Sequence, residues 1–394
     1  MSDLVLRDAA ALPSARCTPL LAGINRGPAL CAAAALVLGA FWIAEAVHAR
    51  QALLFALGAA LGLVLYHANF GFTAAWRVFI ADRRGAGLRA QMAMLALAVM
   101  LFFPALAAGS ILGQSVSGIV APAGVGVLVG AFLFGIGMQL GGGCASGTLY
   151  ALGGGSTRMA ITLTFFVIGS TIGAAHLHWW NALPSLGPVS LLQSFGLVPT
   201  LAVNLLVFAA VAGLTLVLER RRHGRVAGSP PPPRSGLARL LRGPWPLIAG
   251  ALALAVLNFA TLALSGRPWG ITSAFALWGS KAHVALGGDT EFWPYWSTES
   301  MAAALEAPIL ADVTSVMDFG LVLGALLAAA LAGRFAPEWR IPLRAILASV
   351  LGGMLLGYGA RLGYGCNIGA FFSGIASGSL HGWMWIGAAF LGNL

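Results

Sequence analysis

Two cysteines stand in glycine-rich segments that directly follow long apolar runs. Cys144 lies in GGGCASG, and Cys366 lies in GYGCNIG. Each segment holds too many glycines to continue a helix and precedes another apolar stretch, which fits a re-entrant loop at membrane depth. Packing alone would accept Ala or Ser at these positions, so we expect both thiols to be functional.

The residues beside the two thiols could bind an anion. Backbone amides after each cysteine would cap a short half-helix, whose positive N-terminal end favours negative charge. We therefore predict further site residues on both sides of each thiol: Gly143, Ala145, Gly365 and Asn367. The alternative for the preceding glycines is close helix packing through two G-x-x-x-G pairs, Gly137 with Gly141 and Gly359 with Gly363.

The two cysteine segments belong to a longer internal repeat. GVLVGAFLFGIGMQLGGGCASG, which ends at Gly147, aligns without gaps on SVLGGMLLGYGARLGYGCNIG, which ends at Gly369. A weaker upstream pair is NFGFTAAW, from Asn69, and PWGITSAF, from Pro268. We expect this second pair to form two further pore-lining loops through Gly71, Phe72, Gly270 and Ile271, although Gly-aromatic-small sequences are also common in membrane helices.

A thiol at such a site suits a soft, sulfur-containing ligand. In a partly dehydrated environment the neutral S–H form is favoured, and it is a weak, polarisable donor without a repelling charge. A thiolate would need a nearby cation, for which Arg361 is the candidate, because an intramembrane arginine is functional by default. Its repeat partner is the uncharged Gln139. The alternative is that Arg361 extends to the outer interface.

Other ionisable residues lie in or beside the apolar runs. His67, His176, His178 and Asp318 could relay protons, and the alternative for each is a satisfied position at the membrane interface.

Composition indicates that the bilayer is the solvent of this chain. Of 394 residues, 59% are hydrophobic and only 9% are charged. Apolar runs near the length of about 20 residues that crosses a bilayer predict an all-α polytopic membrane protein with about ten segments. They lie near residues 28–48, 51–68, 90–112, 122–140, 159–178, 196–218, 245–266, 318–334, 344–362 and 380–394, the last being short.

Basic residues fix the expected orientation, because cytoplasmic loops retain arginine. A cytoplasmic N-terminus places three arginine groups inside: Arg77, Arg83, Arg84 and Arg89; Arg220, Arg221, Arg222, Arg225, Arg234, Arg239 and Arg242; and Arg334, Arg340 and Arg344. The acidic residues Asp289, Glu291, Glu299 and Glu306 then fall outside. In this topology the helices before the two cysteines run in opposite directions, so the repeat is inverted, an arrangement typical of transporters.

We divide the chain into four parts. Residues 1–50 form an N-terminal segment with Arg7 and Arg16 and the first helix, and residues 51–218 form the first half with its Gly-Cys loop at 141–147. Residues 219–244 are a cytoplasmic Arg/Pro-rich linker that includes Pro230–Pro233. Residues 245–394 form the second half with its loop at 363–369.

Several function classes lack sequence support. The net charge of +10 could suggest nucleic acid, but membrane orientation explains it better, so we expect no nucleic-acid partner. The four cysteines are too few for a disulfide framework, and Cys17 and Cys31 are interpreted as small apolar residues. The chain lacks C-x-x-C, H-E-x-x-H and a phosphate-binding G-x-x-x-x-G-K-[ST] motif, so neither a metal, another cofactor nor ATP hydrolysis is expected.

The paired motifs GIGMQLGGGCASG and GYGARLGYGCNIGAFFSG resemble the YeeE/YedE sulfur-transport family over about residues 50–394. The resemblance implies an hourglass-shaped inverted-repeat protein of the inner membrane that imports thiosulfate, with Cys144 and Cys366 as central cysteines that pass the ion along by S–H contacts. A further family cysteine nearer the N-terminus has no clear match, because NFGFTAAW contains none. Members are also associated with selenium and other sulfur species.

The expected function is import of a small sulfur-containing anion, with thiosulfate as the first candidate. Against a potential of 100 mV a dianion faces about 4.6 kcal/mol, so import needs consumption by a cytosolic sulfurtransferase-like partner or coupling to a proton or cation. One alternative is a membrane sulfur-transfer protein that carries sulfane sulfur on a cysteine, but neither loop contains the His, Asp or Glu that could serve as a base. Another is a membrane anchor for a partner complex, which gives the duplicated cysteines no role.

Overall fold

The fold consists of helices with four short strands. The computed structural model describes residues 23–227 and 236–394, so the predictions for Arg7, Arg16, Cys17, Pro230–Pro233 and Arg234 lie outside the described residues. The long helices and the short helices between them are α1 (Arg26–Ala46), α2 (Ala49–Ala68), α3 (Phe72–Asp82), α4 (Ala86–Ala108), α5 (Val125–Gly141), α6 (Ala145–Gly153), α7 (Thr157–Asn181), α8 (Leu191–Phe195), α9 (Leu197–His223), α10 (Gly236–Arg242), α11 (Leu247–Ser265), α12 (Thr272–Ala285), α13 (Glu299–Glu306), α14 (Val313–Ala332), α15 (Leu343–Leu362), α16 (Gly374–Ala376) and α17 (Leu380–Gly392).

The remaining elements are short. Two short 3₁₀-helices are η1 (Pro294–Trp296) and η2 (Ile309–Ala311), and η3 (Asn367–Ser373) is a π-helix. Strands β1 (Ser110–Ile111) and β2 (Gln114–Ser115) form one antiparallel pair, and β3 (Pro122–Gly124) and β4 (Ser185–Pro188) form another. Both strand pairs lie in connections between long helices, so the molecule is all-α in class.

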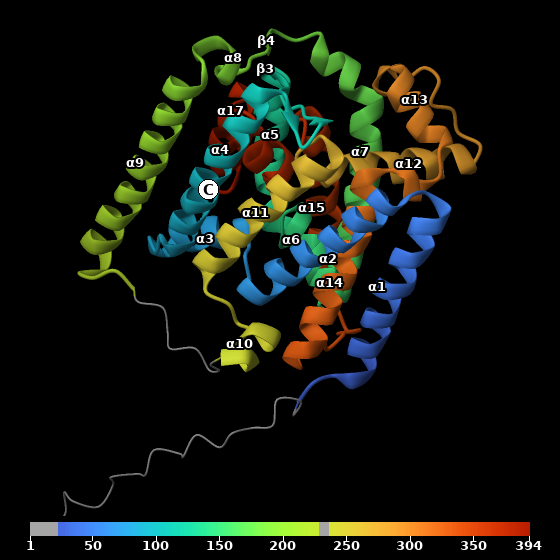
Figure 1. Cartoon of the computed structure of the whole chain (residues 1–394), viewed down its shortest axis with the longest axis horizontal. Coiled ribbons are helices and arrows are strands. Elements are labelled where there is room, and N and C mark those ends of the chain that lie inside the picture. The colour runs from blue at the N-terminus through green and yellow to red at the C-terminus, as the bar shows by residue number, and fades with distance from the viewer. Residues whose placement is uncertain (1–22, 228–235) are drawn as a thin grey trace, which may run out of the picture.

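Nine helices within the described ranges are long and apolar enough to cross a membrane. Two of these combine a long helix with the short one after it, Ala49–Asp82 and Val125–Gly153. The outermost helices expose large apolar side chains, such as Val37 on α1 at 69% and Leu206 on α9 at 69%. Figure 1 shows α1 and α9 on opposite flanks of the bundle. Apolar surface of this extent suits lipid rather than water, so the chain is a polytopic membrane protein.

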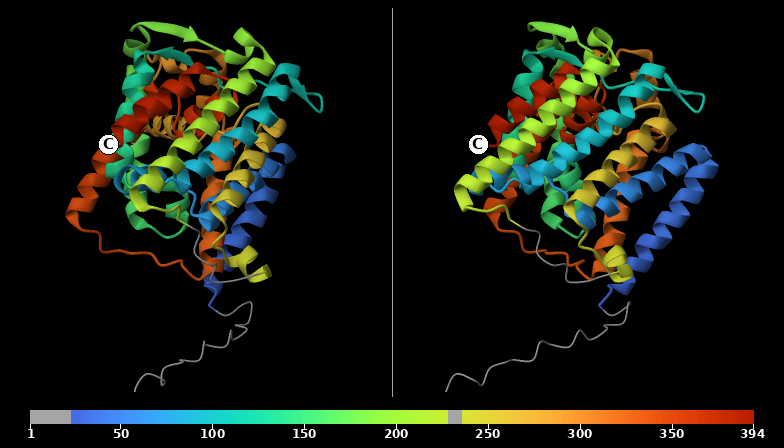
Figure 2. Two further views of the ribbon diagram at one scale, coloured as in Figure 1. Left: turned by 90° about the vertical axis from the view of Figure 1, so that its left-hand side faces the viewer. Right: turned by 60° about the vertical axis from the view of Figure 1, so that its left-hand side comes forward.

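Each of the ten predicted segments corresponds to a helix, with differences at the ends. The last, α17, has 13 residues, too few to span a bilayer alone. Figures 1 and 2 place the C-terminus about half-way along the molecule. The expected loop with Arg77 and Arg89 is wrong in extent, because Arg77 lies in α3 and Arg89 in α4. Arg89 is held there by a 2.8 Å ion pair with the buried Glu219 of α9, a partner 130 residues away that local sequence does not indicate.

Packing between the halves follows the sequence repeat. The repeat partners α5 and α15 pack against each other. Helix α7 packs against α15, and its partner α17 packs against α5 in the same way. Helix α2 packs against α14, and its partner α11 packs against α4. Exchanging each helix for its repeat partner therefore reproduces the same contacts. This exchange is what a two-fold relation between the halves requires.

Glycines at the α5–α15 contact confirm that the two repeats run in opposite directions. A Cβ atom on Gly130 would lie 2.6 Å from the nitrogen of Gly363, and one on Gly352 would lie 2.2 Å from the nitrogen of Gly141. The start of each helix thus meets the end of the other, so the helices are antiparallel. Only glycine permits backbones to approach this closely, so the packing alternative holds for these residues.

Acidic and basic residues lie at opposite ends of the helix bundle. The helix α13, which carries Glu299 and Glu306, lies at the top of Figure 1, and α10, which carries Arg239 and Arg242, lies at the bottom. The acidic and arginine-rich connections are therefore at opposite ends of the molecule.

Candidate functional site

Cys144 is the residue directly before α6. Helix α5 ends where Gly142 adopts a left-handed conformation, with φ of 84° that suits glycine. The chain then extends through Cys144, whose side chain is 1% exposed. Its sulfur lies 3.4 Å from the hydroxyl of Ser146, and the Thr148 hydroxyl donates to its carbonyl oxygen at 2.9 Å. The predicted neighbours Gly143 and Ala145 are both buried beside it.

Cys366 occupies the matching place before η3. Tyr364 and Gly365 have φ of 54° and 151°, so two consecutive residues leave the ordinary regions. A Cβ atom on Gly365 would lie 2.6 Å from the nitrogen of Ala370. Cys366 is fully buried, and the Ile368 amide donates to its sulfur at 3.4 Å. Its helix opens as a π-helix, a geometry frequent at functional sites.

The two thiols stand at the starts of two elements that pack together where the halves meet. Cys366 interacts electrostatically with Cys144, and α6 packs against η3. Beside each thiol is the glycine three residues later. A Cβ atom on Gly369 would meet no described atom within 4 Å outside its own helix and chain neighbours, and one on Gly147 would meet only the Cys144 sulfur, at 3.5 Å. Since both glycines are buried, the thiols border enclosed open space.

The second pair of motifs forms helix starts around this centre. Gly71 precedes α3, and Ile271 precedes α12. The ring of Phe72 packs edge-on against Phe371 of η3, with centroids 6.0 Å apart, and Gly270 lines a cavity. The predicted residues thus lie near the cysteine loops, but whether these segments re-enter from one membrane face remains a prediction.

Arg361 is buried, so its predicted alternative position at the outer interface is wrong. The side chain is 6% exposed. Its guanidinium donates to the Tyr295 hydroxyl and, at 3.1 Å, to the Thr272 hydroxyl at the start of α12. Tyr295 belongs to η1, which packs against α7. The repeat partner Gln139 instead donates to Asn393 near the C-terminus at 2.8 Å.

Polar atoms without partners gather around the thiols. The hydroxyl of Thr73, both amide atoms of Asn367, and both oxygens of Asp318 are buried and have no hydrogen-bond partner among the described residues. Thr73 lies near the Cys144 sulfur, and Asp318 interacts electrostatically with Cys366. Buried polar groups are normally paired, so these atoms fit a region that holds water or a polar ligand.

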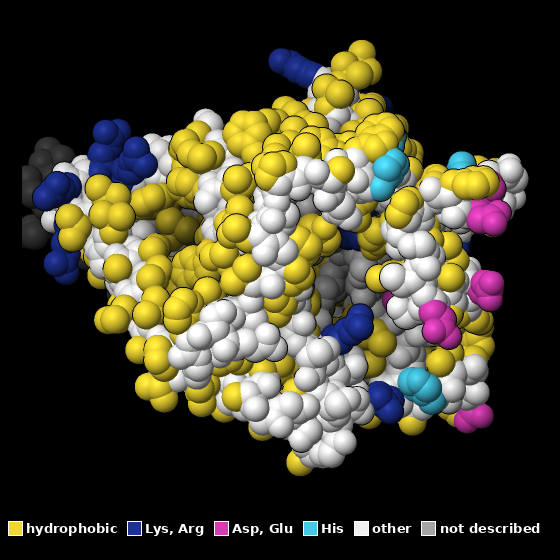
Figure 3. Space-filling view, turned by 90° about the horizontal axis from the view of Figure 1, so that it is seen from above, with side chains coloured by type: hydrophobic (Ala, Val, Ile, Leu, Met, Phe, Trp, Pro, Cys, Tyr) yellow, Lys and Arg dark blue, Asp and Glu magenta, His cyan; other side chains and the backbone are white. Residues whose placement is uncertain are grey.

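Two cavities approach the centre from opposite ends. The α13-side cavity, about 540 Å³, is lined by Arg267, Gly270, Tyr295 and Met317 among others. The α10-side cavity, about 180 Å³, includes Tyr66, His67, Asn69, Tyr150 and Arg334 in its lining. Figure 3, viewed onto the α13 end, shows a hollow with basic side chains at its rim and acidic side chains to one side. The cavities thus reach the corresponding loops of the two halves.

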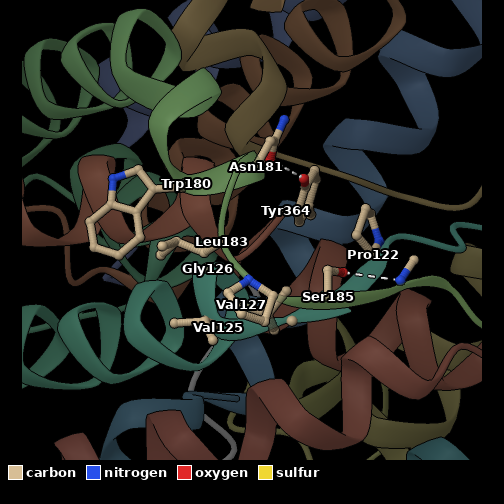
Figure 4. A pocket seen from close by; sticks show the side chains of 12 residues that line it. Pro122, Val125, Gly126, Val127, Trp180, Asn181, Leu183, Ser185 and Tyr364 are labelled. Carbon is tan, nitrogen blue, oxygen red and sulfur yellow. Dashed lines mark hydrogen bonds between the residues drawn. The ribbon is translucent and has the colours of Figure 1, made fainter.

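A third cavity, about 350 Å³, lies at the surface near the second cysteine loop. Figure 4 shows Tyr364 pointing to Asn181 across it, with the Tyr364 hydroxyl donating to the Asn181 side chain at 2.7 Å. This bond fixes the residue that begins the turn to Cys366.

Sequence reasoning missed several of these residues. Thr73 and Thr272 occupy the same position in the motifs NFGFTAAW and PWGITSAF, and threonine is the only polar residue that the two motifs share in register. This match could have indicated both residues. Asp318 is one of the proton-relay candidates, and its alternative position at the membrane interface is wrong, because the side chain is fully buried. His67 is also buried, at 3% exposed. Gly147 and Gly369 were aligned as repeat partners without a functional role.

Two inverted halves, a buried central pair of thiols and a cavity from either end define the molecule as a membrane transport protein rather than an enzyme. The profile of the sulphur transport family matches residues 67–394, most of the chain. The chain therefore belongs to the sulphur transport family, as the cysteine motifs predicted.

Proteins similar to this chain carry corresponding names. The chain is 30% identical over 274 residues to the thiosulfate transporter TsuA of Spirochaeta thermophila, covering 66% of this chain and 73% of that protein. It is 26% identical over 352 residues to the thiosulfate transporter TsuA of Escherichia coli, covering 85% of this chain and 89% of that protein. A match to the probable transporter YedE of Escherichia coli is 32% identical but covers 38% of this chain and only 36% of YedE.

Proposed function

We propose that this protein imports thiosulfate across the bacterial inner membrane through the space between Cys144 and Cys366. The observation that carries the proposal is the matched pair of buried thiols, each at a helix start and each beside a glycine that borders open space. The relatives named as thiosulfate transporters favour this ion over other sulfur or selenium species.

The chemistry of the site suits a soft anion. A neutral thiol offers a weak S–H donor to the terminal sulfur of thiosulfate, while the amides of Gly147 and Gly369 interact with the two sulfurs at the helix starts. Asn367 and Thr73 supply unpartnered polar atoms that can replace part of the hydration shell. Arg361 adds positive charge near the α13-side entrance. The backbone around the passage is formed by Gly143, Ala145, Gly365, Gly71, Phe72, Gly270 and Ile271. Gln139 lies further from the passage than these residues do.

The orientation follows from charge. Arginine-rich connections at the α10 end are retained in the cytoplasm, so we place the N-terminus inside and the α13-side cavity outside. Thiosulfate would enter past Arg267 and leave past Arg334. A cytosolic sulfurtransferase-like protein at the α10 end would remove the product and draw the flow inward.

Uptake in cells that lack their own sulfur importers tests the proposal. We expect the wild type to support radiolabelled thiosulfate uptake, and Cys144→Ala or Cys366→Ala to abolish most of it at matched membrane levels. Cys31→Ala is the matched control, because Cys31 is an exposed thiol on α1 with no repeat partner. Uptake that persists in both central variants would remove the thiols from the path. Uptake of selenite or sulfite instead of thiosulfate would overturn the substrate assignment.

A further inference from the structure

Asp318 is a buried carboxylate in the middle of the protein. It lies in the second turn of α14, is 0% exposed, and has no hydrogen-bond partner for either oxygen among the described residues. The preceding residue, Met317, lines the α13-side cavity together with Val313 and Thr314. Asp318 interacts electrostatically with Cys366. It therefore lies between the base of that cavity and the second thiol.

The charged surroundings of Asp318 provide no compensation. Its largest electrostatic interaction is with another carboxylate, Asp312, at the start of the same helix. The elements packed against α14 on its inner side, α2, α6 and α12, carry Arg50, Tyr66, His67, Tyr150, Lys281 and His283. Those on its other side, α1 and α10, carry Arg26, Cys31, Glu45, Arg239 and Arg242.

Several cations in this set donate hydrogen bonds to other groups. Arg50 donates to Gln114, Lys281 donates to the Ala307 carbonyl oxygen, and Arg242 donates to the Leu331 carbonyl oxygen. Arg361 donates to Tyr295 and Thr272. An ionised Asp318 would thus be a buried negative charge without a paired cation, and it would also repel any anion that approaches Cys366.

The first half shows that a carboxylate is not needed for packing at this place. Gln91 is the sixth residue of α4, as Asp318 is the sixth residue of α14, and the two helices are repeat partners. The Gln91 side chain is also buried, and its oxygen accepts a 2.9 Å hydrogen bond from the indole of Trp76. A neutral amide fills the position in one half, and an ionisable acid fills it in the other.

We propose that Asp318 is the proton-binding residue that couples anion import to proton entry. Water in the α13-side cavity delivers a proton to the carboxylate, and the resulting neutral acid lets the anion move past Cys366. The proton leaves on the α10 side after the anion, and the carboxylate is ready for another cycle. No bond other than the O–H bond forms or breaks.

A proton fits this site better than a metal cation does. Hard cations require several oxygen ligands at once, whereas no group of three or more His, Cys, Asp or Glu side chains that could hold a metal ion occurs among the described residues. A proton requires only the carboxylate itself. Sodium dependence is therefore an outcome that would contradict the inference.

The inference rests on the proposed function, so the experiment reports both. Purified protein in liposomes with the membrane potential clamped at zero is given radiolabelled thiosulfate, and a pH-sensitive dye inside records proton entry. One proton per anion predicts about tenfold greater accumulation for each unit by which the outside is more acidic. We expect the interior to acidify when thiosulfate is added, with sodium or with choline outside.

Variants assign the proton to one residue. Asp318→Asn is expected to lose both the pH dependence and the thiosulfate-driven acidification, leaving only equilibration. Asp312→Asn is the matched control, because it removes a neighbouring carboxylate that is already hydrogen bonded to Ser315, and it should retain the pH dependence.

Each result has a separate meaning. Wild-type uptake without proton entry, or with a sodium requirement, would overturn the coupling inference whether or not the variants fold, and leave the import function intact. An Asp318→Asn protein that still acidifies the interior would overturn the assignment to Asp318. Liposomes that take up no more thiosulfate than empty ones would overturn the proposed function and the inference together.

Discussion

The two halves of the molecule share a backbone frame but differ in charge. Both place a cysteine at a helix start, a glycine three residues later beside open space, and a threonine at the start of the neighbouring helix. The first half carries the neutral Gln91 and Gln139, and the second half carries Asp318 and Arg361 at the corresponding positions.

This difference indicates which features are needed twice and which only once. The frame that holds the thiols is duplicated, which suits the proposed path, since an ion crossing the centre would meet two loops in succession. Asp318 and Arg361 have no charged counterpart in the first half, and both lie towards the α13-side cavity. A symmetric frame with asymmetric charge gives the two entrances different electrostatic potentials. A transporter that works in one direction can use this difference.

The largest expected effect comes from disrupting the seam that both halves share. Gly352→Leu would place a side chain where a Cβ atom is already 2.2 Å from the Gly141 backbone. Overpacking costs typically about 1–3 kcal/mol, and more where backbone must move. We expect loss of the monodisperse folded protein in detergent. Gly213→Leu on α9 is the control, since a Cβ there meets nothing within 4 Å. A Gly352→Leu protein that melts at the wild-type temperature would contradict the close seam.

Arg361→Gln would make the second half resemble the first. It removes charge-assisted hydrogen bonds to Tyr295 and Thr272, each of which typically contributes about 1.5–3 kcal/mol. Thiosulfate uptake should fall about tenfold or more at equal expression. Arg50→Gln, which removes an exposed arginine, should change uptake little. Equal uptake by the two variants would assign Arg361 a structural role only.

Filling the space beside the thiols tests whether that space is the path. Gly369→Ala adds a methyl group that meets no described atom outside its helix and chain neighbours, and Gly147→Ala adds one near the Cys144 sulfur only. We expect unchanged thermal stability and a several-fold drop in uptake for each. Gly387→Ala on α17, also without a neighbour within 4 Å, should behave as wild type. Wild-type uptake in both central variants would show that the ion passes elsewhere.

The smallest effect should come from Ser146, a polar residue of the first cysteine loop that the second loop lacks. Ser146 lies 3.4 Å from the Cys144 sulfur, whereas the second loop has Ile368 at the corresponding position. A hydrogen bond of this kind typically contributes about 1 kcal/mol, so Ser146→Ala should lower uptake by about fivefold at most. The Michaelis constant and maximal rate, compared with those of Thr148→Val, would separate an effect on the thiol from one on α6. A rise in uptake would mean that the hydroxyl hinders the ion.

Much of the fold could be predicted because its signals are local. Hydropathy marks each long helix, and the glycine spacing around Cys144 and Cys366 marks the repeat and its two loops. The burial of Arg361 depends on Tyr295, 66 residues away, and the bond of Gln139 depends on Asn393, 254 residues away. Such contacts leave no local pattern. The sequence marks Asp318 as a proton-relay candidate but cannot place it, because α14 is apolar on nearly every side and its sequence does not say which side faces the centre.

The seam between α5 and α15 also limits how the protein can move. Gly130, Gly141, Gly352 and Gly363 lie so close to the opposite backbone that sliding either helix by one turn would bring side chains into main-chain atoms. An elevator motion, in which one half slides past the other, is therefore sterically blocked at this contact. We expect turnover to involve side chains, water and ion within a nearly rigid scaffold, so cross-linking α5 to α15 should leave transport intact.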